Sequence, residues 1–401
     1  EHREKIITSW NDDNGTITYL NNRTWYFLPK ESTGNLEDNI TNLNPVALTA
    51  AHVAKKNNSF SEFMLYMLDG AFEELGVTLF DPKPVRELLF EGYNDKIIDV
   101  VKNWTFLHDI FTIPFDKFGW FYPRNGSIWY DGVINMNTGA KDLSTFGEIQ
   151  RWNFSPKTDY YQGECGVVNG SAGELFPPNR EKDSITIFVP DFCRQLVYKD
   201  NAEKYGLKGY RFWADANFLA NAIKNPSNWC YSRDNITWPS GVLEVSKCKF
   251  GAPAFVSHAH FHMADSVYRE NVLNLKEPSD SDNFYLTLEP ITGVPLEVLG
   301  NLQLNMHLEN IPEIKIMKDV RNVMMPMMWF SQTAEITPEL ANSLFWVAIA
   351  KEYLPPIMYC LLGLGVFFVI FAVILLMIQS RDRSSEEQLL TTDEDDETVH
   401  H

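Results

Sequence analysis

Residues 357–378 read IMYCLLGLGVFFVIFAVILLMI, an uninterrupted apolar run of 22 residues that ends 23 residues before the C-terminus. An α-helix rises about 1.5 Å per residue, so this run is roughly 33 Å long, enough to cross the hydrocarbon core of a bilayer. The run predicts a transmembrane helix. We therefore expect an ectodomain over residues 1–356 and an acidic cytoplasmic tail over residues 379–401.

The chain is acidic, with 401 residues and a formal net charge of −19. The tail contributes −6, because it holds eight acidic residues against Arg381 and Arg383, so −13 remains on the ectodomain. Such a charge disfavours nucleic acid and broad attraction to anionic membranes. The chain begins at Glu1 without an apolar leader. An outward-facing domain needs an entry signal, so we expect that the N-terminus is truncated.

N-glycosylation sequons indicate which side of the membrane the ectodomain faces. Nine N-x-[ST] sequons precede the apolar run, and none follows it. This one-sided placement predicts a luminal or extracellular ectodomain. Arg381 and Arg383 directly after the run agree, because positive residues flank membrane helices on the cytoplasmic side. The sequons lie at Asn14, Asn22, Asn39, Asn57, Asn103, Asn125, Asn153, Asn169 and Asn235.

Five cysteines are present, and Cys360 lies inside the apolar run, as a small apolar residue or a palmitoylation site. The other four fall within 84 residues of the ectodomain. An even number in this compartment predicts two disulfides, with three pairings open. A zinc site is the less favoured alternative, because no CxxC pair occurs. The four are Cys165, Cys193, Cys230 and Cys248.

Helical patterns gather in residues 44–92, where Asn44 can cap a helix that Pro45 opens. Residues 60–76 carry apolar side chains on more than one helical face, which fits either a helix buried in a bundle or a surface that contacts lipid or a partner. Elsewhere, short alternating runs predict strands, and the fold class is α+β. The strand-like runs are SITIFV, YRFWAD, VLEVSKC, PAFVSHAHF, FYLTLEPITG, LQLNMHLEN and PEIKIMK.

His258, His260 and His262 have a spacing of two, which places all three on one face of a strand. They fit polar residues of a strand face, a pH-dependent group or a metal site. Same-face residues are roughly 7 Å apart, which is long for metal bonds of about 2 Å, so we predict no metal. No GxSxG, HExxH or P-loop motif occurs. We therefore expect neither catalysis nor a cofactor.

The tail segment from Ser385 to Leu390 approximates an acidic dileucine sorting signal, in which Leu389 and Leu390 would bind clathrin adaptors. Ser385 stands where the signal has an acidic residue, so it fits only when phosphorylated. Glu386 and Glu387 supply charge one and two places later. The alternative is a coincidental pair of leucines in a disordered acidic tail.

Eight segments, in order, resemble the class B scavenger receptor family, the group of the fatty acid translocase and the lysosomal integral membrane protein. The resemblance implies an insect-type member with a span at each end, of which the first is missing here. It further implies an antiparallel β-barrel with an apical helical bundle and an apolar tunnel. The segments are PVRELLFEGY, CGVVNGSAGELFPP, FVPDFCRQL, GYRFWA, GVLEVSKCKFGAPAFVSHAHF, LEPITGVPL, LQLNMHL and MPMMWF.

The resemblance also implies which cysteines pair. The family pattern joins Cys165 to Cys230 and Cys193 to Cys248. A third family bridge would need two cysteines near residues 231–238, which read YSRDNITW here, so we expect a looser loop. Of the three histidines, only the second stands where the family usually has one.

Residues 60–76 align with the exposed apex helix of the family, which in the fatty acid translocase carries lysines that favour anionic ligands. Here the end of this segment is acidic, which suits a neutral lipid, a cationic ligand or a protein partner better. We expect ligand contacts from Phe63, Met67, Phe72, Glu73 and Glu74.

Two functions follow from the resemblance. The first is a receptor that takes up or transfers lipids or lipoprotein-like ligands. The second is a sorting receptor that carries a luminal protein partner to endolysosomes. The expected location is the plasma membrane, the endosomal–lysosomal membrane or both.

Overall fold

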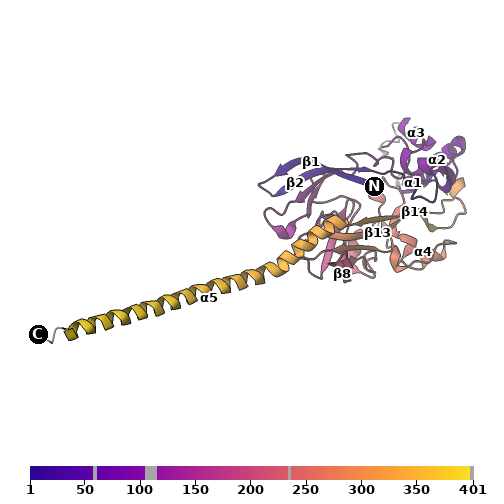
Figure 1. Ribbon diagram of the computed structural model, residues 1–401. Helices are drawn as coiled ribbons and strands as arrows, with labels where there is room; N and C mark the ends of the chain where they lie inside the picture. The colour runs from indigo at the N-terminus through magenta and orange to yellow at the C-terminus, as the bar shows by residue number, and fades with distance from the viewer. Residues whose placement is uncertain (57–60, 104–114, 234–235, 398–401) are drawn as a thin grey trace. The chain divides into compact units, whose positions relative to one another are not determined.

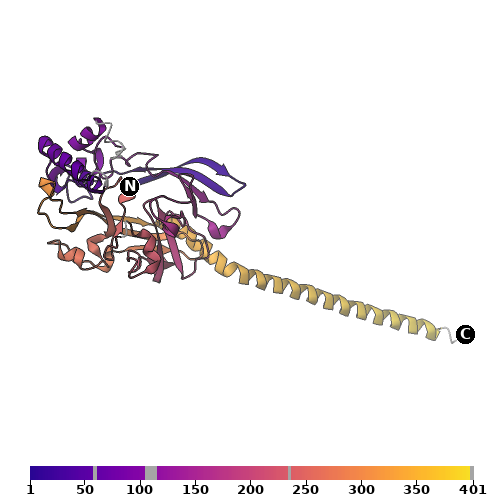
Figure 2. The same ribbon diagram turned by 180° about the vertical axis from the view of Figure 1, so that it is seen from behind.

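The computed structural model describes residues 1–56, 61–103, 115–233 and 236–397. The chain divides into two compact units, Glu1–Ile336 and Thr337–His401. The first unit combines strands with short helices, and the second contains one long helix (Figure 1, and Figure 2 from behind). This mixture of helix and sheet confirms the α+β class.

The smaller sheet of the first unit has four antiparallel strands in the order β1-β2-β5-β6. Ile17 and Tyr19 alternate on β2 and meet Met136 and Ile134 of β5 across the ladder. All four side chains are buried in one apolar cluster, as the period of a strand requires. The strands are β1 (His2–Asn11), β2 (Thr16–Thr24), β5 (Val133–Asn137) and β6 (Ile149–Trp152).

The larger sheet has eight strands in the order β10-β11-β13-β12-β9-β8-β7, with β14 paired to β13. Leu196, Phe212 and Leu286 from three neighbouring strands are buried together against this sheet. The strands are β7 (Ser184–Val189), β8 (Phe192–Lys204), β9 (Leu207–Trp213), β10 (Leu243–Glu244), β11 (Ala254–His258), β12 (Phe284–Leu288), β13 (Pro295–Leu308) and β14 (Val323–Glu335).

The two sheets are joined at one place by the backbone of Ser171, which bridges Glu148 beside β6 and Ile187 of β7. Gly170 precedes it with φ +87°, and a side chain there would collide with the backbone of Thr186. Only glycine therefore allows the strands to approach at this point.

The free edges of the two sheets also meet. Gln332 Nε2 of β14 donates a hydrogen bond of 3.1 Å to Glu1 Oε2, next to β1. This contact is made by side chains, and the described strand pairs do not close the sheets into a barrel. The two sheets are therefore linked at these points, and their closure into a barrel stays a prediction.

Helix α1 (Pro45–Lys56) begins as predicted, because the side-chain oxygen of Asn44 accepts hydrogen bonds from the backbone N–H groups of Val46 and Ala47. The buried side chains of the helices α1, α2 and α3, here called the apex, share one core with the ends of β13 and β14. Besides short 3-10 helices, the first unit also contains α2 (Ser61–Leu75), α3 (Lys96–Asn103), α4 (Val267–Glu270), the two-stranded sheet of β3 (Asn39–Leu43) and β4 (Phe80–Pro84), and a π-helix at Glu87–Glu91.

Three predicted strands are wrong in whole or in part. In the run VLEVSKC only Leu243–Glu244 forms a strand, and Ser246–Lys249 is a 3-10 helix. The run PEIKIMK contains a 3-10 helix, Lys315–Met317, because Ile311, Ile314 and Met317 are buried at a spacing of three rather than two. Strand β11 ends at His258, and a 3-10 helix, Ala259–Phe261, replaces its predicted continuation.

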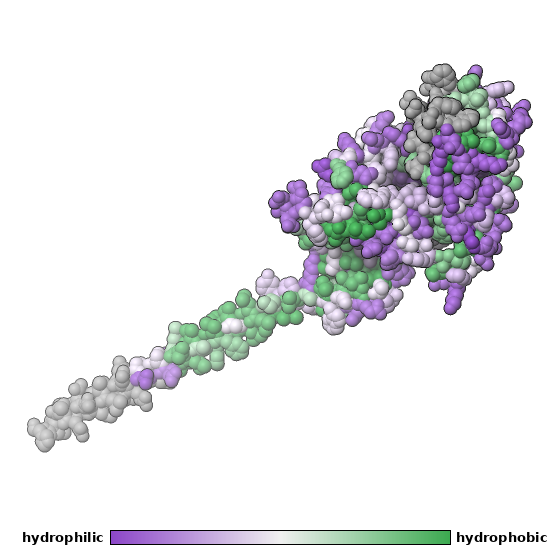
Figure 3. All heavy atoms as spheres, turned by 90° about the horizontal axis from the view of Figure 1, so that it is seen from above, coloured by the Kyte–Doolittle hydropathy of each residue, from purple (hydrophilic) through white to green (hydrophobic). Residues whose placement is uncertain are grey.

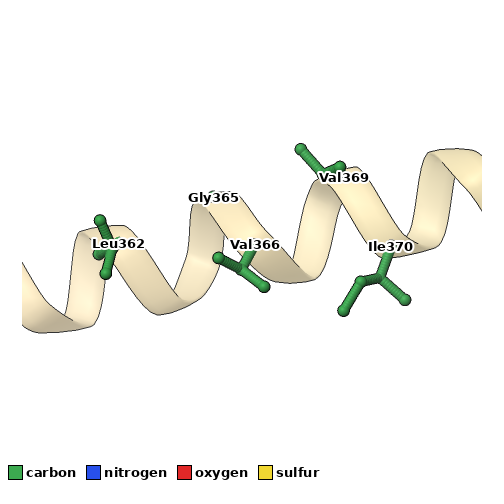
Figure 4. Close-up of a pocket in the computed structure, with 5 residues that line it drawn as sticks. All are labelled: Leu362, Gly365, Val366, Val369 and Ile370. Atoms are coloured by element: carbon green, nitrogen blue, oxygen red, sulfur yellow. The ribbon is translucent and has the colours of Figure 1, made fainter.

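Helix α5 (Pro338–Glu397) makes up the second unit. Its segment Pro338–Arg381 is, within the described part of the chain, the one helix long and apolar enough to cross a membrane. Figure 3 shows the apolar band along this helix in green. Leu362, Val366, Val369 and Ile370 project around Gly365 (Figure 4). The shallow pocket that these side chains line lies on the surface of a single helix and is not an enclosed site.

Candidate functional site

Helix α2 of the apex has two different faces. Phe63, Tyr66 and Met67 are exposed to 65%, 77% and 48%, whereas Leu65 and Phe72 are buried. Positions three, four and seven apart share a helical face, so the exposed side chains form one apolar surface. One face of the helix is therefore buried as in a bundle, and the other is an exposed apolar surface whose contact with lipid or a partner stays a prediction.

Phe72 differs from the expectation for a ligand contact. Its side chain is only 1% exposed and packs in the core below the helix. It stands seven residues after Leu65, hence two turns along the same buried face. That spacing is a signal in the sequence that would have assigned Phe72 to the core. Tyr66, which was not among the expected contacts, is the most exposed of these side chains.

The charge at the end of α2 is partly balanced. Glu73 Oε2 lies 2.5 Å from Lys315 Nζ, which raises the pKa of that lysine, and Asp69 Oδ1 accepts a 2.7 Å hydrogen bond from the Lys315 backbone. Glu74 is exposed. The sequence could not reveal Lys315 as a partner, because it lies in a distant segment that was predicted as a strand.

Contacts from neighbouring elements hold α2 in place. Lys96 Nζ at the start of α3 donates a 2.6 Å hydrogen bond to the Leu75 carbonyl at the end of α2. A cation at this position satisfies a free carbonyl and opposes the negative end of the helix dipole. On α1, Lys55 Nζ lies 2.7 Å from Glu309 Oε1, just beyond β13. These contacts fix α2 against α3, and they fix α1 against the end of β13.

The three histidines are buried, although they do not continue one strand. His260 adopts φ 56°, in the left-handed region, which turns the chain out of the path of β11. The rings of His258 and His262 nevertheless remain close, with centroids 6.2 Å apart. Among the described residues, no group of three or more His, Cys, Asp or Glu side chains is arranged to hold a metal ion.

An ion network around the buried Asp131, which sequence reasoning missed, lies at the edge of the smaller sheet. Asp131 accepts from Arg124 at 2.8 Å and lies 2.6 Å from Arg23 Nε. Glu1 lies 3.0 Å from Arg3 and 3.5 Å from Arg23. Burial lowers the pKa of Arg23 to about 10, with Arg124 and Arg3 adding to the effect. The network holds β1 and β2 against the segment before β5.

The cysteines agree in part with the family pattern. Cys165 and Cys230 form a disulfide with Cα atoms 5.7 Å apart. Cys248 is a free thiol in this structure, and the side chain of Cys193 lies outside the described residues, so their pairing stays a prediction. Burial raises the pKa of the Cys248 thiol, and the nearby Asp191 carboxylate adds to this effect. The thiolate is therefore disfavoured at Cys248.

The predicted glycosylation sites differ in exposure. Asn22 and Asn125 are half-buried, and Asn57 and Asn235 lie outside the described residues. The exposed sites are Asn14, Asn39, Asn103, Asn153 and Asn169.

The side chains of the predicted sorting signal at Leu389 and Leu390 also lie outside the described residues, although the backbone there continues α5. The structure therefore carries no information on how the two leucines would be presented to an adaptor.

Comparison with known proteins gives the family. The CD36 family profile matches residues 1–376. Protein peste of Drosophila melanogaster is 34% identical over 87% of this chain, which spans 62% of that protein's length. Scavenger receptor class B member 1 of Cricetulus griseus is 30% identical over 91% of this chain and 70% of its own. Lysosome membrane protein 2 of Homo sapiens is 29% identical over 92% of this chain and 75% of its own.

These matches cover both the apex and the strands, and they confirm the resemblance drawn from eight short segments. The chain belongs to the CD36 family.

Proposed function

We propose that this chain is a membrane-anchored receptor that binds hydrophobic ligands at its helical apex, with neutral lipid as the favoured class. The observation that carries the proposal is the exposed apolar face of α2, made by Phe63, Tyr66 and Met67. Exposed apolar patches mark binding sites more often than chance. Glu74 beside this face, with Glu73 already paired to Lys315, supports a neutral rather than an anionic headgroup.

The second part of the proposal concerns the path of the ligand. We propose that the two sheets close as a barrel around an apolar tunnel that leads lipid towards the membrane helix. The bridge through Ser171 and the hydrogen bond between Gln332 and Glu1 support such closure, because they link both pairs of sheet edges. A dry path spares an acyl chain about 0.8 kcal/mol of exposure to water per CH₂.

Binding of a fluorescent sterol and of a fluorescent fatty acid to the full-length chain in detergent tests the apex. The variant with Phe63→Ser, Tyr66→Ser and Met67→Ser should bind the sterol at least ~10-fold more weakly, because each buried apolar side chain contributes about 1.5–3 kcal/mol. Ile223→Ser is the matched control, since Ile223 is also exposed but lies elsewhere. Unchanged sterol binding by the triple variant would refute the apex as the site.

The proposed topology places residues 1–356 in the lumen or outside the cell, residues 357–378 in the bilayer and residues 379–401 in the cytoplasm. The sequons before α5 and the positive residues after its apolar run support it. Removal of N-glycans should increase the gel mobility of the expressed chain. If no glycan is present on Asn14, Asn39 or the other exposed sequons, the orientation is wrong.

A sorting receptor for a luminal protein is the second candidate. The similarity to lysosome membrane protein 2 and the leucine pair in the tail favour it. Changing Leu389→Ala and Leu390→Ala together should move the chain from endosomes to the plasma membrane. A wild-type chain found mainly at the plasma membrane would refute this function and leave lipid binding untouched.

A further inference from the structure

Residues 258–263, here called the histidine loop, have a strained backbone. His260, Phe261 and Met263 have φ of 56°, 57° and 58°, although none is glycine. Residues other than glycine rarely adopt a positive φ, and this backbone conformation persists only where the surrounding structure enforces it. The loop follows β11 and lies against β13, where the His260 N–H donates a 3.0 Å hydrogen bond to Gln303 Oε1.

The histidine loop buries three imidazoles whose ring nitrogens have few hydrogen-bond partners. The rings of Phe218 and His262 lie 5.7 Å and 6.2 Å from that of His258, which is 2% exposed. Apart from the backbone of Asn301, which favours a proton on His258, the two ring nitrogens of His258 have no hydrogen-bond partner among the described residues. His260 Nε2 and His262 Nε2 likewise make none. Buried polar atoms in this state are costly, and a charge there is costlier still.

Carboxylates face two of the three rings. Asp280 Oδ1 lies 3.9 Å from His262 Nε2, and Asp282 Oδ1 lies 4.0 Å from His260 Nε2. Lys276 Nζ lies 3.7 Å from the same Asp282 oxygen. The remaining charged neighbour is Lys199 of β8, which disfavours a proton on His262.

Within the part of the chain that the structure describes, the other elements against the loop contribute no charge. Gln303 and Asn305 of β13 and Ser257 of β11 form a neutral hydrogen-bonded row beneath it. Trp329 of β14 lies beside His260, with ring centroids 5.2 Å apart. No carboxylate acts on His258, whereas the neighbouring His262 opposes its protonation.

We propose that the histidine loop is a pH-sensitive switch, which is held against β13 and β14 at neutral pH and released when the buried His258 takes up a proton in an acidic compartment. The proposal goes beyond lipid binding and does not depend on it. Burial lowers the pKa of His262 in the closed loop, and Asp280 opposes this effect because it is a partner for a proton there. A proton on His258 gains only the backbone of Asn301, which burial and His262 outweigh, so it favours the open loop, where water solvates the imidazolium.

The direction and size of the effect follow from His258. Burial, and then His262, lowers the pKa of His258 to about 4, against an ordinary value of 6.5. Above pH 6.5 the imidazole is neutral in both states, and below it the open loop binds a proton that the closed loop does not. The ratio of open to closed loop should therefore rise about 20-fold between pH 7 and pH 5.

Hydrogen exchange of the full-length chain in detergent, followed by mass spectrometry, tests the switch. Protection of peptides that cover residues 259–263 is compared at pH 7 and pH 5, after correction for the intrinsic pH dependence of exchange. The wild type should lose about 20-fold in protection. His258→Phe should retain protection at pH 5, and the control His2→Gln, on exposed β1, should behave as the wild type.

A second variant keeps the test decisive if His258→Phe disturbs folding. Asp280 is exposed, and Asp280→Asn removes the partner that favours a proton on His262 in the closed loop. This variant should lose more protection at pH 5 than the wild type. A change below threefold in the wild type, equal opening in His258→Phe, or no effect of Asp280→Asn would each overturn the proposal.

Discussion

The two phenylalanines on opposite faces of α2 provide a matched test of the apex. Phe72→Ala removes a ring that is 1% exposed, and such a change costs about 3–5 kcal/mol in lost burial and in the cavity left behind. Phe63→Ala removes a ring that is 65% exposed and should change stability by less than about 0.5 kcal/mol. Both changes delete the same atoms from the same helix.

The expected shift in melting temperature follows from the size of the folded unit. Unit Glu1–Ile336 should have an unfolding entropy of about 0.7 kcal/mol/K, at roughly 2.1 cal/mol/K per residue. A loss of about 4 kcal/mol then lowers Tm by about 6 °C for Phe72→Ala, and Phe63→Ala should stay within about 1 °C.

Differential scanning fluorimetry measures both shifts, and sterol binding of the same samples separates stability from recognition. Phe63→Ala should weaken binding without a change in Tm. Equal shifts for the two variants, or a shift below about 2 °C for Phe72→Ala, would refute the assignment of the two faces.

Three further predictions concern stability. Replacing Cys165 and Cys230 by serine opens a loop with a sequence separation of 65 and should cost about 4 kcal/mol; an unchanged Tm under non-reducing conditions would contradict this. Asn44→Ala removes the cap of α1 and should cost about 1 kcal/mol in urea unfolding, whereas Asn44→Asp should cost less. Burial, with help from Lys56, lowers the pKa of His52 to about 4. Below pH 6.5 the unfolded chain therefore binds a proton that the folded chain does not, and stability should fall by about 3 kcal/mol between pH 6.5 and pH 4. His52→Phe should remove this part of the slope of urea midpoint against pH, and an identical slope would contradict the assignment.

Features encoded by neighbouring residues could be predicted from the sequence. Asn44 and Pro45 define the start of α1, because a cap and a fixed φ act within one turn. The alternating run at Ser184–Val189 became β7 for a similar reason, since a period of two suits a strand with one buried face. In both cases, all the residues that determine the element lie within a dozen positions of one another in the sequence.

The errors arose where distant packing outweighed a local pattern. The alternation around Lys315 predicts a strand, but Ile314 and Met317 reach the apical core three residues apart. The spacing of the histidines predicts one strand face, but the left-handed backbone of His260 ends that strand. Propensity is a weak prior in such places.

The ion network around Asp131 could not be predicted from local sequence patterns. Arg23 and Arg124 approach the same carboxylate from segments about a hundred residues apart in the chain. No period or motif connects such positions, and only the pairing of β2 with β5 brings them together. The apolar surface of α2, in contrast, could be predicted from the sequence, including Phe63 and Met67, and the spacing of Phe72 from Leu65 places Phe72 in the core.

The disulfide between Cys165 and Cys230 has a consequence for a chain that meets proteases. The loop that it closes contains β7, β8 and β9 entirely. The turn between β8 and β9 exposes Tyr205 and Gly206, and exposed turn tips are preferred sites of cleavage. A cut there leaves two polypeptides that remain covalently linked and paired within one sheet. Such a nicked chain runs as a single band on a gel until a thiol reductant separates its two pieces.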